Sequence, residues 1–276
     1  MKKRLILGAV STFLVSTLIS TVGVGESKAE NKPISADFSV SYSPYYYKWS
    51  EKAGIDEKGW VHALKVSGKM HVSKIIWIPY IEPSFKIYGG EVKYDGQAWT
   101  GEAAKTKTNY NGWEAELNLG YTYAFDKNFK VSLYGGIGRE YWKRDLENAI
   151  VDNTLAIGYS EKWRQNYVKI GVKPEYDIGN YYVFGNFYAK YPWKVKESAS
   201  LFDVEVEPGK KLNYGAELGV GVKGFLKKDL GVFASVFYER DKFGKSDKDY
   251  SEVIGDYLHQ PESKRETYGF RIGINF

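Results

Sequence analysis

The stretch Thr267-Tyr268-Gly269-Phe270-Arg271-Ile272-Gly273-Ile274-Asn275-Phe276 ends the chain and decides how the rest is interpreted. Successive side chains of an extended strand point to opposite faces, so alternate residues share a face. One face of this segment is aromatic and aliphatic, from Tyr268 to Phe276, whereas the other is small, polar or charged, from Thr267 to Asn275. The pattern predicts an amphipathic strand with one face toward an apolar phase.

The other end of the chain has the layout of a secretory signal peptide. Residues 2–4 are basic, an apolar stretch runs from about residue 5 to 24, and Ser27-Lys28-Ala29 offers small residues where a signal peptidase requires them. We therefore expect cleavage after Ala29. A membrane anchor is the alternative, but Ser, Thr and Gly residues interrupt the apolar stretch, which ends in a cleavage pattern.

Composition narrows the class of protein. The signal carries four basic residues and one acidic residue, so its removal takes the net charge from +5 to +2 and leaves no support for nucleic-acid binding. The chain has no cysteine, which excludes disulfides, a lipoprotein anchor and a thiolate zinc site. After the signal no stretch approaches the roughly 18 apolar residues of a spanning helix. Aromatic residues make up 17% while mean hydropathy is only −0.44, as expected when alternate residues meet lipid.

The remaining chain divides into about ten alternating strands, an even number. We place them near residues 36–48, 60–72, 77–94, 110–125, 129–144, 161–177, 181–195, 212–226, 231–243 and 266–276. Short connections are expected near 73–74, 126–128, 178–180 and 227–229, and long ones near 49–59, 95–109, 145–160, 196–211 and 244–265. Short and long connections alternate, which is typical of a closed antiparallel transmembrane β-barrel with short periplasmic turns and long extracellular loops. A soluble sandwich would need compact turns at both ends of shorter strands.

The secretory signal and the final strand ending on Phe276 together resemble bacterial outer-membrane β-barrel proteins, a porin-like or small-barrel superfamily. The resemblance implies an all-β barrel over residues 30–276, after a signal peptide over 1–29, integral to the outer membrane of a Gram-negative cell. It also implies contact with outer-membrane lipid and lipopolysaccharide, and recognition of Phe276 by the barrel assembly machinery. We expect a monomer. The resemblance does not fix an activity.

Aromatic residues collect where the strands leave the apolar band, which predicts two interfacial girdles. The outer girdle is expected to contain Tyr45, Tyr46, Tyr47, Trp49, Trp60, Tyr94, Tyr110, Trp113, Tyr141, Trp142, Trp163, Tyr191 and Trp193. The periplasmic girdle is expected to contain Trp77, Tyr121, Tyr123, Phe125, Phe129, Tyr176, Tyr181, Phe225, Phe233 and Phe276. One charge breaks the apolar face, because Arg139 has the lipid-facing parity after Ile137; a bulge or the end of the buried span is expected there.

The inward positions carry charges of both signs. Acidic candidates are Asp37, Glu82, Glu114, Glu116, Glu140, Glu175, Glu217, Glu239 and Asp241, and basic ones are Lys65, Lys69, Lys86, Lys130, Lys169, Lys173, Lys190, Lys223 and Arg271. An unpaired ion out of water costs several kcal/mol, so these charges need partners in a narrow lumen. The balance predicts a hydrogen-bonded plug. A narrow wet path for small solutes is the alternative.

Two barrel enzymes offer other interpretations. Omptin proteases use an Asp pair opposite an Asp-His pair at the outer rim. This chain has three histidines, His62, His71 and His259, none of them in an Asp-x-His pattern, although Asp145 and Asp241 lie near outer strand ends.

Lipid A deacylases use a His-x-Ser pair with a nearby carboxylate, which His71-Val72-Ser73 and Glu82 resemble. That motif falls at a periplasmic turn, whereas the lipid substrate lies in the outer leaflet.

No phosphate-binding loop, metal-ligand cluster or nucleotide fingerprint is present in the sequence, so we predict no catalytic, cofactor-binding or metal residue. We expect a non-enzymatic barrel that is structural or surface-binding, with a largely plugged polar lumen. A narrow porin-like channel is the alternative, and an omptin-like protease or a lipid A deacylase is a more distant one. The segment 244–265 discriminates between the first two, because folding into the mouth would weaken the channel interpretation.

Overall fold

The computed structural model describes residues 34–72, 78–98, 101–225 and 230–276. The predicted signal peptide and the expected turns at 73–74 and 227–229 lie outside these residues, so neither is tested. No helix in the described part of the chain has the length and apolarity needed to span a membrane.

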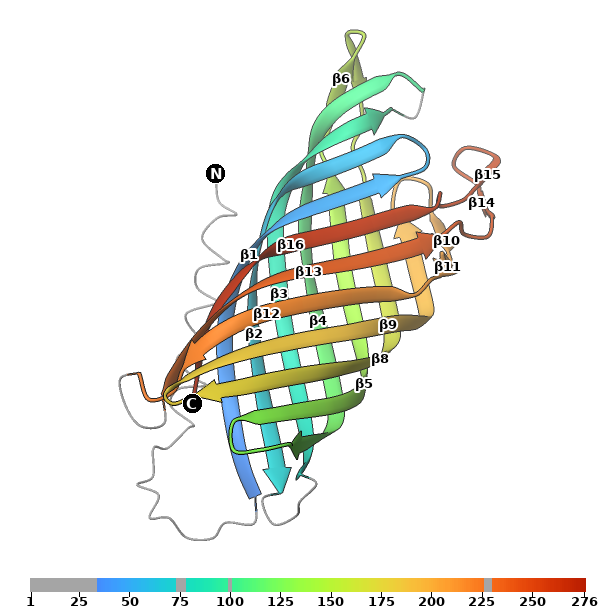
Figure 1. The fold of residues 1–276 in the computed structure, drawn as a ribbon. Helices are drawn as coiled ribbons and strands as arrows, with labels where there is room; N and C mark the ends of the chain where they lie inside the picture. The colour runs from blue at the N-terminus through green and yellow to red at the C-terminus, as the bar shows by residue number, and fades with distance from the viewer. Residues whose placement is uncertain (1–33, 73–77, 99–100, 226–229) are drawn as a thin grey trace. The chain divides into compact units, whose positions relative to one another are not determined.

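The described chain forms a closed antiparallel β-barrel, as predicted (Figure 1). Ten strands make its wall: β1 (Ile34–Glu51), β2 (Ile55–Val72), β3 (Ile78–Gln97), β4 (Ala103–Ala124), β5 (Phe129–Leu146), β8 (Ser160–Ile178), β9 (Tyr181–Ala199), β12 (Asn213–Val222), β13 (Gly231–Gly244) and β16 (Ser263–Asn275). Short strands lie in the connections: β6 (Ala149–Val151), β7 (Thr154–Ala156), β10 (Val204–Val206), β11 (Gly209–Lys210), β14 (Asp249–Ser251) and β15 (Asp256–Leu258).

The first and last barrel strands close the wall. β1 pairs with β16 in antiparallel register from Ser39↔Asn275 to Glu51↔Ser263. The backbone N–H of Phe276 donates to the carbonyl of Phe38 at 2.9 Å, and the N–H of Phe38 donates back at 3.2 Å. The terminal residue therefore takes part in the closure itself. Its recognition by an assembly machinery stays a prediction.

Two connections expected to be long loops are mostly strand. The pairing of β1 with β2 continues to Glu51↔Ile55, and that of β3 with β4 to Gln97↔Ala103. Only three and five residues, 52–54 and 98–102, lie between these strands. The alternation signal failed here because charged side chains replace the apolar ones on the outward face once the strands leave the membrane. Backbone pairing does not depend on that change.

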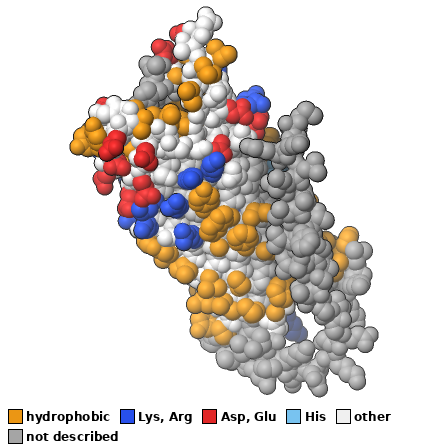
Figure 2. Space-filling model, turned by 180° about the vertical axis from the view of Figure 1, so that it is seen from behind, with side chains coloured by type: hydrophobic (Ala, Val, Ile, Leu, Met, Phe, Trp, Pro, Cys, Tyr) orange, Lys and Arg blue, Asp and Glu red, His pale blue; other side chains and the backbone are white. Residues whose placement is uncertain are grey.

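The outward face carries an apolar band. Its exposed members include Phe85, Leu117, Leu119, Leu133, Ile137, Val168, Ile170, Leu218, Val220, Val236, Phe270 and Ile272. Figure 2 shows hydrophobic side chains gathered over one part of the visible face, with charged side chains beyond them. Such a band is what a lipid bilayer requires of a spanning barrel.

The predicted outer girdle was only half right. Tyr46, Trp60, Trp113, Tyr141, Tyr191 and Trp193 have the outward parity. Seven of the predicted members instead point inward and are buried: Tyr45, Tyr47, Trp49, Tyr94, Tyr110, Trp142 and Trp163. The prediction grouped aromatic residues by height along the strand and did not apply the two-residue alternation to them. Trp77, predicted for the periplasmic girdle, lies outside the described residues.

Inward tyrosine rings lie over glycines of the neighbouring strand. Tyr134 is directly opposite Gly171, and a Cβ on that glycine would come within 2.5 Å of the ring carbon Cζ. The same cross-strand pairs recur as Tyr80–Gly120 and Tyr188–Gly215. Glycine thus gives a large ring room against the wall, a form of aromatic rescue. The lumen is filled by rings as well as by ions.

This arrangement predicts a difference between two glycines of the wall. Gly171→Ala should lower the temperature at which the barrel unfolds, because its methyl group would collide with the Tyr134 ring. Gly135→Ala should leave that temperature nearly unchanged, since the nearest atom to its Cβ is 3.7 Å away. Heat-modifiable migration on a detergent gel measures both transitions. Equal unfolding temperatures for the two variants would contradict the proposed role of the ring–glycine contact.

Candidate functional site

Two large cavities lie at opposite ends of the lumen. One, of about 660 Å³, opens at the end of the barrel where the chain termini of the sheet lie and is lined by residues such as Lys69, Glu82 and Asn275. The other, of about 760 Å³, lies at the opposite end, among the long connections. We call the second one the cup. Two layers of side chains separate the cavities.

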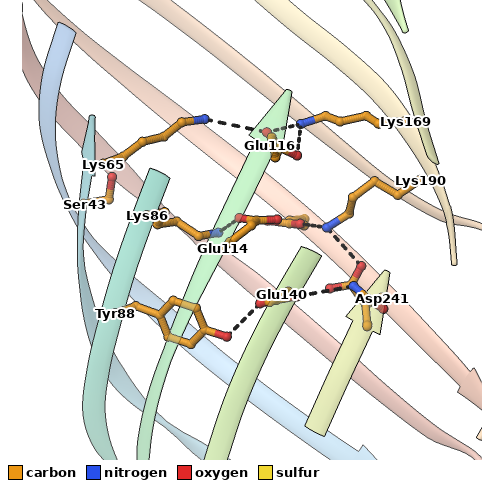
Figure 3. Close-up of polar contacts among 12 residues, drawn as sticks. Ser43, Lys65, Lys86, Tyr88, Glu114, Glu116, Glu140, Lys169, Lys190 and Asp241 are labelled. Atoms are coloured by element: carbon orange, nitrogen blue, oxygen red, sulfur yellow. Dashed lines mark hydrogen bonds and ion pairs between the residues drawn. The ribbon is translucent and has the colours of Figure 1, made fainter. Parts of the chain in front are cut away.

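The first layer is a network of buried ions (Figure 3). The ammonium of Lys169 contacts Glu116 at 2.8 Å, and Lys86 forms an ion pair with Glu114. The hydroxyl of Tyr167 donates to both carboxylates, at 2.5 Å to Glu114 and 2.8 Å to Glu116. Acids from β4 are therefore neutralised by bases from strands on either side, as a plugged lumen requires.

Arg265 completes this layer toward the cup. Its guanidinium donates two hydrogen bonds to Glu140, at 2.9 and 2.7 Å, and a third to Asp241 at 2.9 Å. The hydroxyl of Tyr88 also donates to Glu140, at 2.7 Å, and Lys190 approaches Asp241 at 3.3 Å. A cavity of only about 30 Å³ remains among these side chains, which is room for about one water.

Most of the charges predicted for the lumen are paired there. The pairs are Lys86–Glu114, Lys169–Glu116, Lys173–Glu82, Lys130–Glu175, Lys190–Glu239, Lys190–Asp241 and Arg271–Glu217, with Lys65 at 4.0 Å from Glu116 and Lys223 on Asp177. Lys69 differs, because its ammonium lies 4.2 Å from the centre of the Tyr80 ring.

The second layer is an aromatic septum made of Trp49, Trp142, Trp163 and Phe243. All four side chains are fully buried, and neighbouring ring centroids are 5.1 to 6.0 Å apart. They come from β1, β5, β8 and β13, so the septum reaches across the lumen. The guanidinium of Arg265 lies 4.7 Å from the Trp142 ring, and that of Arg144 lies 4.8 Å from the Trp49 ring. These are cation–π contacts.

Arg144 forms the floor of the cup. Its guanidinium contacts Glu57 at 3.1 Å and Glu51 at 3.3 Å, and it forms a third, closer ion pair with Glu161. Glu57 additionally accepts a hydrogen bond from the hydroxyl of Thr108 at 2.8 Å. A buried guanidinium with several carboxylate partners is held in one orientation.

The septum also holds the floor in place. The indole N–H of Trp49 donates to Glu51 at 2.7 Å, and that of Trp163 donates to Glu161 at 3.3 Å. Two carboxylates of the floor are therefore fixed by both a cation and an indole, which leaves their positions little freedom.

Glu197 of β9 also lines the cup and has no cationic partner among the described residues. Only 4% of it is exposed. With its amide turned to donate, Gln260 lies 3.1 Å from the carboxylate. Burial raises the pKa of Glu197 well above its usual range, and the charges of Glu161 and Glu51 raise it further.

The walls of the cup come from the long connections and are largely apolar. They include Ala98, Leu146, Ala149, Val151, Leu155, Phe202, Val204, Val206, Val253, Ile254 and Leu258. Within 244–265, the Ser246 hydroxyl accepts the backbone N–H of Gln260 at 2.7 Å, and the Ser251 hydroxyl donates to the carbonyl of Phe202 at 2.6 Å. This segment thus lines the mouth, the arrangement that weakens the channel interpretation.

Sequence reasoning missed the cup. Glu51 and Glu57 fell in an expected loop over 49–59, and Glu197 in another over 196–211. One signal in the sequence could have indicated the floor of the cup. On β5, Trp142 and Arg144 follow the inward residue Glu140 at two-residue spacing, so they also point inward.

The residues considered for an omptin-like site do not lie together. Asp145 faces outward and binds Lys143 at 2.6 Å, whereas Asp241 is buried below the septum. His62 is exposed and lies 2.7 Å from the hydroxyl of Tyr42, and His259 is exposed in the loop. No group of three or more potential metal ligands occurs in the part of the chain that the structure describes.

The motif weighed for lipid A deacylation is not tested, because Ser73 lies outside the described residues. Its candidate carboxylate, Glu82, is bound to Lys173 at 2.7 and 2.8 Å.

Comparison with solved structures finds other outer-membrane proteins. The outer membrane protease OmpT from Escherichia coli matches with a TM-score of 0.59 and 14% identity, over 91% of this chain and 99% of that one. The translocator domain of the autotransporter NalP from Neisseria meningitidis matches with a TM-score of 0.45 and 10% identity, over 98% of this chain and 96% of that one. An outer membrane channel from Pseudomonas putida matches with a TM-score of 0.41 and 10% identity, over 92% of this chain and 100% of that one.

No family model and no curated protein matches the sequence. At these identities the likeness concerns the fold alone. Together with the apolar outward band, the closed barrel makes this chain an integral β-barrel of the outer membrane.

Removal of the floor cation should destabilise the barrel. Arg144→Met leaves three buried carboxylates without their shared partner, a change that costs about 3–5 kcal/mol when a buried pair is broken. Lys58→Met is the matched control, because Lys58 adjoins Glu57 on β2 but is exposed. Urea unfolding followed by tryptophan fluorescence measures both. A loss in the control as large as in Arg144→Met would contradict the role assigned to the floor.

Proposed function

We propose that this outer-membrane barrel is a non-conducting, non-enzymatic surface-binding protein whose cup takes an external ligand with a positive charge beside an apolar group. The observation that carries the proposal is the combination of a closed septum below the cup with an excess of buried acids in its floor. The first feature argues against passage of solutes, and the second argues for binding.

The charge of the floor supports a cationic ligand. Glu51, Glu57 and Glu161 form ion pairs with a single guanidinium, that of Arg144, and Glu197 lines the same cup. Four negative charges against one positive leave an excess of three when all four acids are ionised. Buried charge without a counter-ion is unfavourable. A ligand ammonium or guanidinium would supply the missing counter-ion, most directly at Glu197.

The walls support an apolar portion of the same ligand. Aliphatic side chains from several connections line the cup above the acids, and its volume of about 760 Å³ lies in the range of small-molecule and side-chain sites. A basic amino-acid side chain flanked by apolar ones in a peptide combines both properties.

The non-enzymatic part of the proposal rests on how the acids are held. Glu51 and Glu161 each bind Arg144 and an indole N–H, so both carboxylates are held in place in the floor. A carboxylate that activates water needs free access to that water. The protease activity named for OmpT is not carried over by a likeness of 14% identity.

The first experiment is single-channel recording of the refolded, signal-free protein in a planar bilayer. We expect no discrete conductance steps, because the septum and the ion pairs below it both close the lumen. The triple variant Trp163→Ala/Arg265→Ala/Glu140→Ala opens both layers and should conduct. Heat-modifiable migration verifies folding in each case. Reproducible steps from the wild type would favour the narrow-channel alternative.

The second experiment measures binding of the capped tripeptide Leu-Arg-Leu to the detergent-solubilised barrel by calorimetry. Glu197→Gln should weaken binding about tenfold, in keeping with about 1.4 kcal/mol for one lost charged contact. Glu252→Gln, an exposed acid outside the cup lining, should not. The uncharged Leu-Gln-Leu peptide should bind poorly to the wild type.

The same binding should depend on pH. Because burial raises the pKa of Glu197, its carboxyl is protonated at low pH and becomes a counter-ion only as the pH rises. Affinity should therefore increase as the pH rises through the range of this raised pKa in the wild type, and Glu197→Gln should flatten the profile. Identical profiles for the two proteins would show that Glu197 does not meet the cation. Cleavage of the peptide would overturn the non-enzymatic assignment.

A further inference from the structure

Three adjacent strands carry a patch of cations on the outer wall of the barrel. It consists of Arg139 and Lys143 on β5, Lys162 and Arg164 on β8, and Lys194 and Lys196 on β9. Cross-strand register brings them together, because Lys143 lies opposite Lys162 and Arg164 lies opposite Lys196. We call these six residues the basic patch.

The patch is poorly neutralised by the protein. Lys143 binds Asp145 and Lys196 binds Glu205. The other four cations, Arg139, Lys162, Arg164 and Lys194, are exposed and have no ion-pair partner in the part of the chain that the structure describes.

A second row of lysines on the wall provides a contrast. Lys58, Lys93 and Lys107 lie opposite one another on β2, β3 and β4. Here acids are interspersed, and Lys107 binds Glu91 at 2.7 Å. Outward cations alone therefore do not distinguish the patch; the lack of acids on β8 and β9 at this level does.

The patch lies at the depth of the membrane interface. Ile137, which is 55% exposed, is the last apolar outward residue of β5, and Arg139 and Tyr141 follow it on the same face. Exposed Tyr191 precedes Lys194 on β9. Aromatic side chains favour the headgroup level, so the cations stand where outer-leaflet phosphates lie. Arg139, the charge that breaks the apolar outward face of β5, therefore marks the end of the apolar band. The expected bulge is absent there, because β5 pairs with both neighbours without interruption.

A β-bulge lies within the patch. Asn166 pairs with Lys194, whereas the next residue, Tyr167, pairs with Pro192, so Trp193 is an extra residue on β9. As a result Trp193 and Lys194 are consecutive yet both exposed on the outer wall. Bulges re-aim side chains and are found next to functional sites. Here the bulge places an indole beside an unpaired ammonium.

We propose that the basic patch binds the phosphate groups of a phosphorylated outer-leaflet glycolipid, with Trp193 packed against its sugar or the start of its acyl chains. Arginine guanidinium groups bind phosphate through paired hydrogen bonds, and lysine adds point charge. The lipid source is favoured over free phosphate, because the patch borders the apolar band and includes an interfacial indole. This site is separate from the cup and does not rest on the cup's ligand.

The test uses the full mature barrel in zwitterionic micelles, with bis-phosphorylated lipid A as the probe and native mass spectrometry as the readout. Arg139→Gln/Arg164→Gln/Lys194→Gln should weaken lipid binding at least tenfold. Lys58→Gln/Lys93→Gln/Lys107→Gln removes the same charge from the other row and should weaken it less than threefold. Dephosphorylated lipid A should bind the wild type as weakly as lipid A binds the patch variant.

Three results would overturn the proposal. One is an equal loss in both triple variants, which would indicate a general effect of net charge. Another is equal binding of dephosphorylated lipid A, which would assign the contact to acyl chains alone. The third is complete competition by inorganic phosphate at millimolar concentration, which would make the patch a free-phosphate site. Heat-modifiable migration checks folding, and Lys194→Gln alone, with an expected threefold loss, serves if the triple variant does not fold.

Discussion

Closure of the wall between β1 and β16 is the constraint on which the rest of the structure depends. Once the wall is sealed, half of all strand side chains point into a lumen where mainly other side chains can solvate them. Each inward ion then needs a partner from another strand, as Glu116 finds in Lys169 and Glu140 in Arg265. Glycines such as Gly171 make room for the rings that fill the remaining space. The plug follows from the closure.

The aromatic septum connects this plug to the cup. One guanidinium lies against each side of it, Arg265 below and Arg144 above. Its indoles donate to acids of the floor, so these carboxylates of the cup are positioned by residues packed in the barrel interior. A site built on rigid strands holds its geometry better than one built on loops alone. The cup combines both, with a floor from strands and walls from loops.

Alternation along the strands made the fold and most of the lumen predictable. The ions of β4 and β8 were assigned to the inside by parity alone, because lipid-facing neighbours such as Leu117 and Ile170 are plainly apolar. Beyond the membrane both faces of a strand are polar, so alternation no longer distinguishes the inward face from the outward one. The strand ends in that region were therefore predicted as loops. The prediction placed Trp49, Trp142 and Trp163 in the outer girdle because of their height along the strands. It therefore did not find the septum that they form. The meeting of Glu51, Glu57 and Glu161 at Arg144 depends on closure and could not come from one strand.

Strand β5 shows how one alternation can serve two surfaces at once. Its inward residues Glu140, Trp142 and Arg144 enter the plug, the septum and the cup in turn, while outward Arg139 and Lys143 belong to the basic patch. A one-residue slip of register would exchange the two sets and place unpaired cations in the lumen and buried aromatics in the headgroups. Pairing of β5 with β4 and β8 over nearly its full length prevents this. The same register therefore fixes both the acidic floor of the cup and the basic patch on the outer wall.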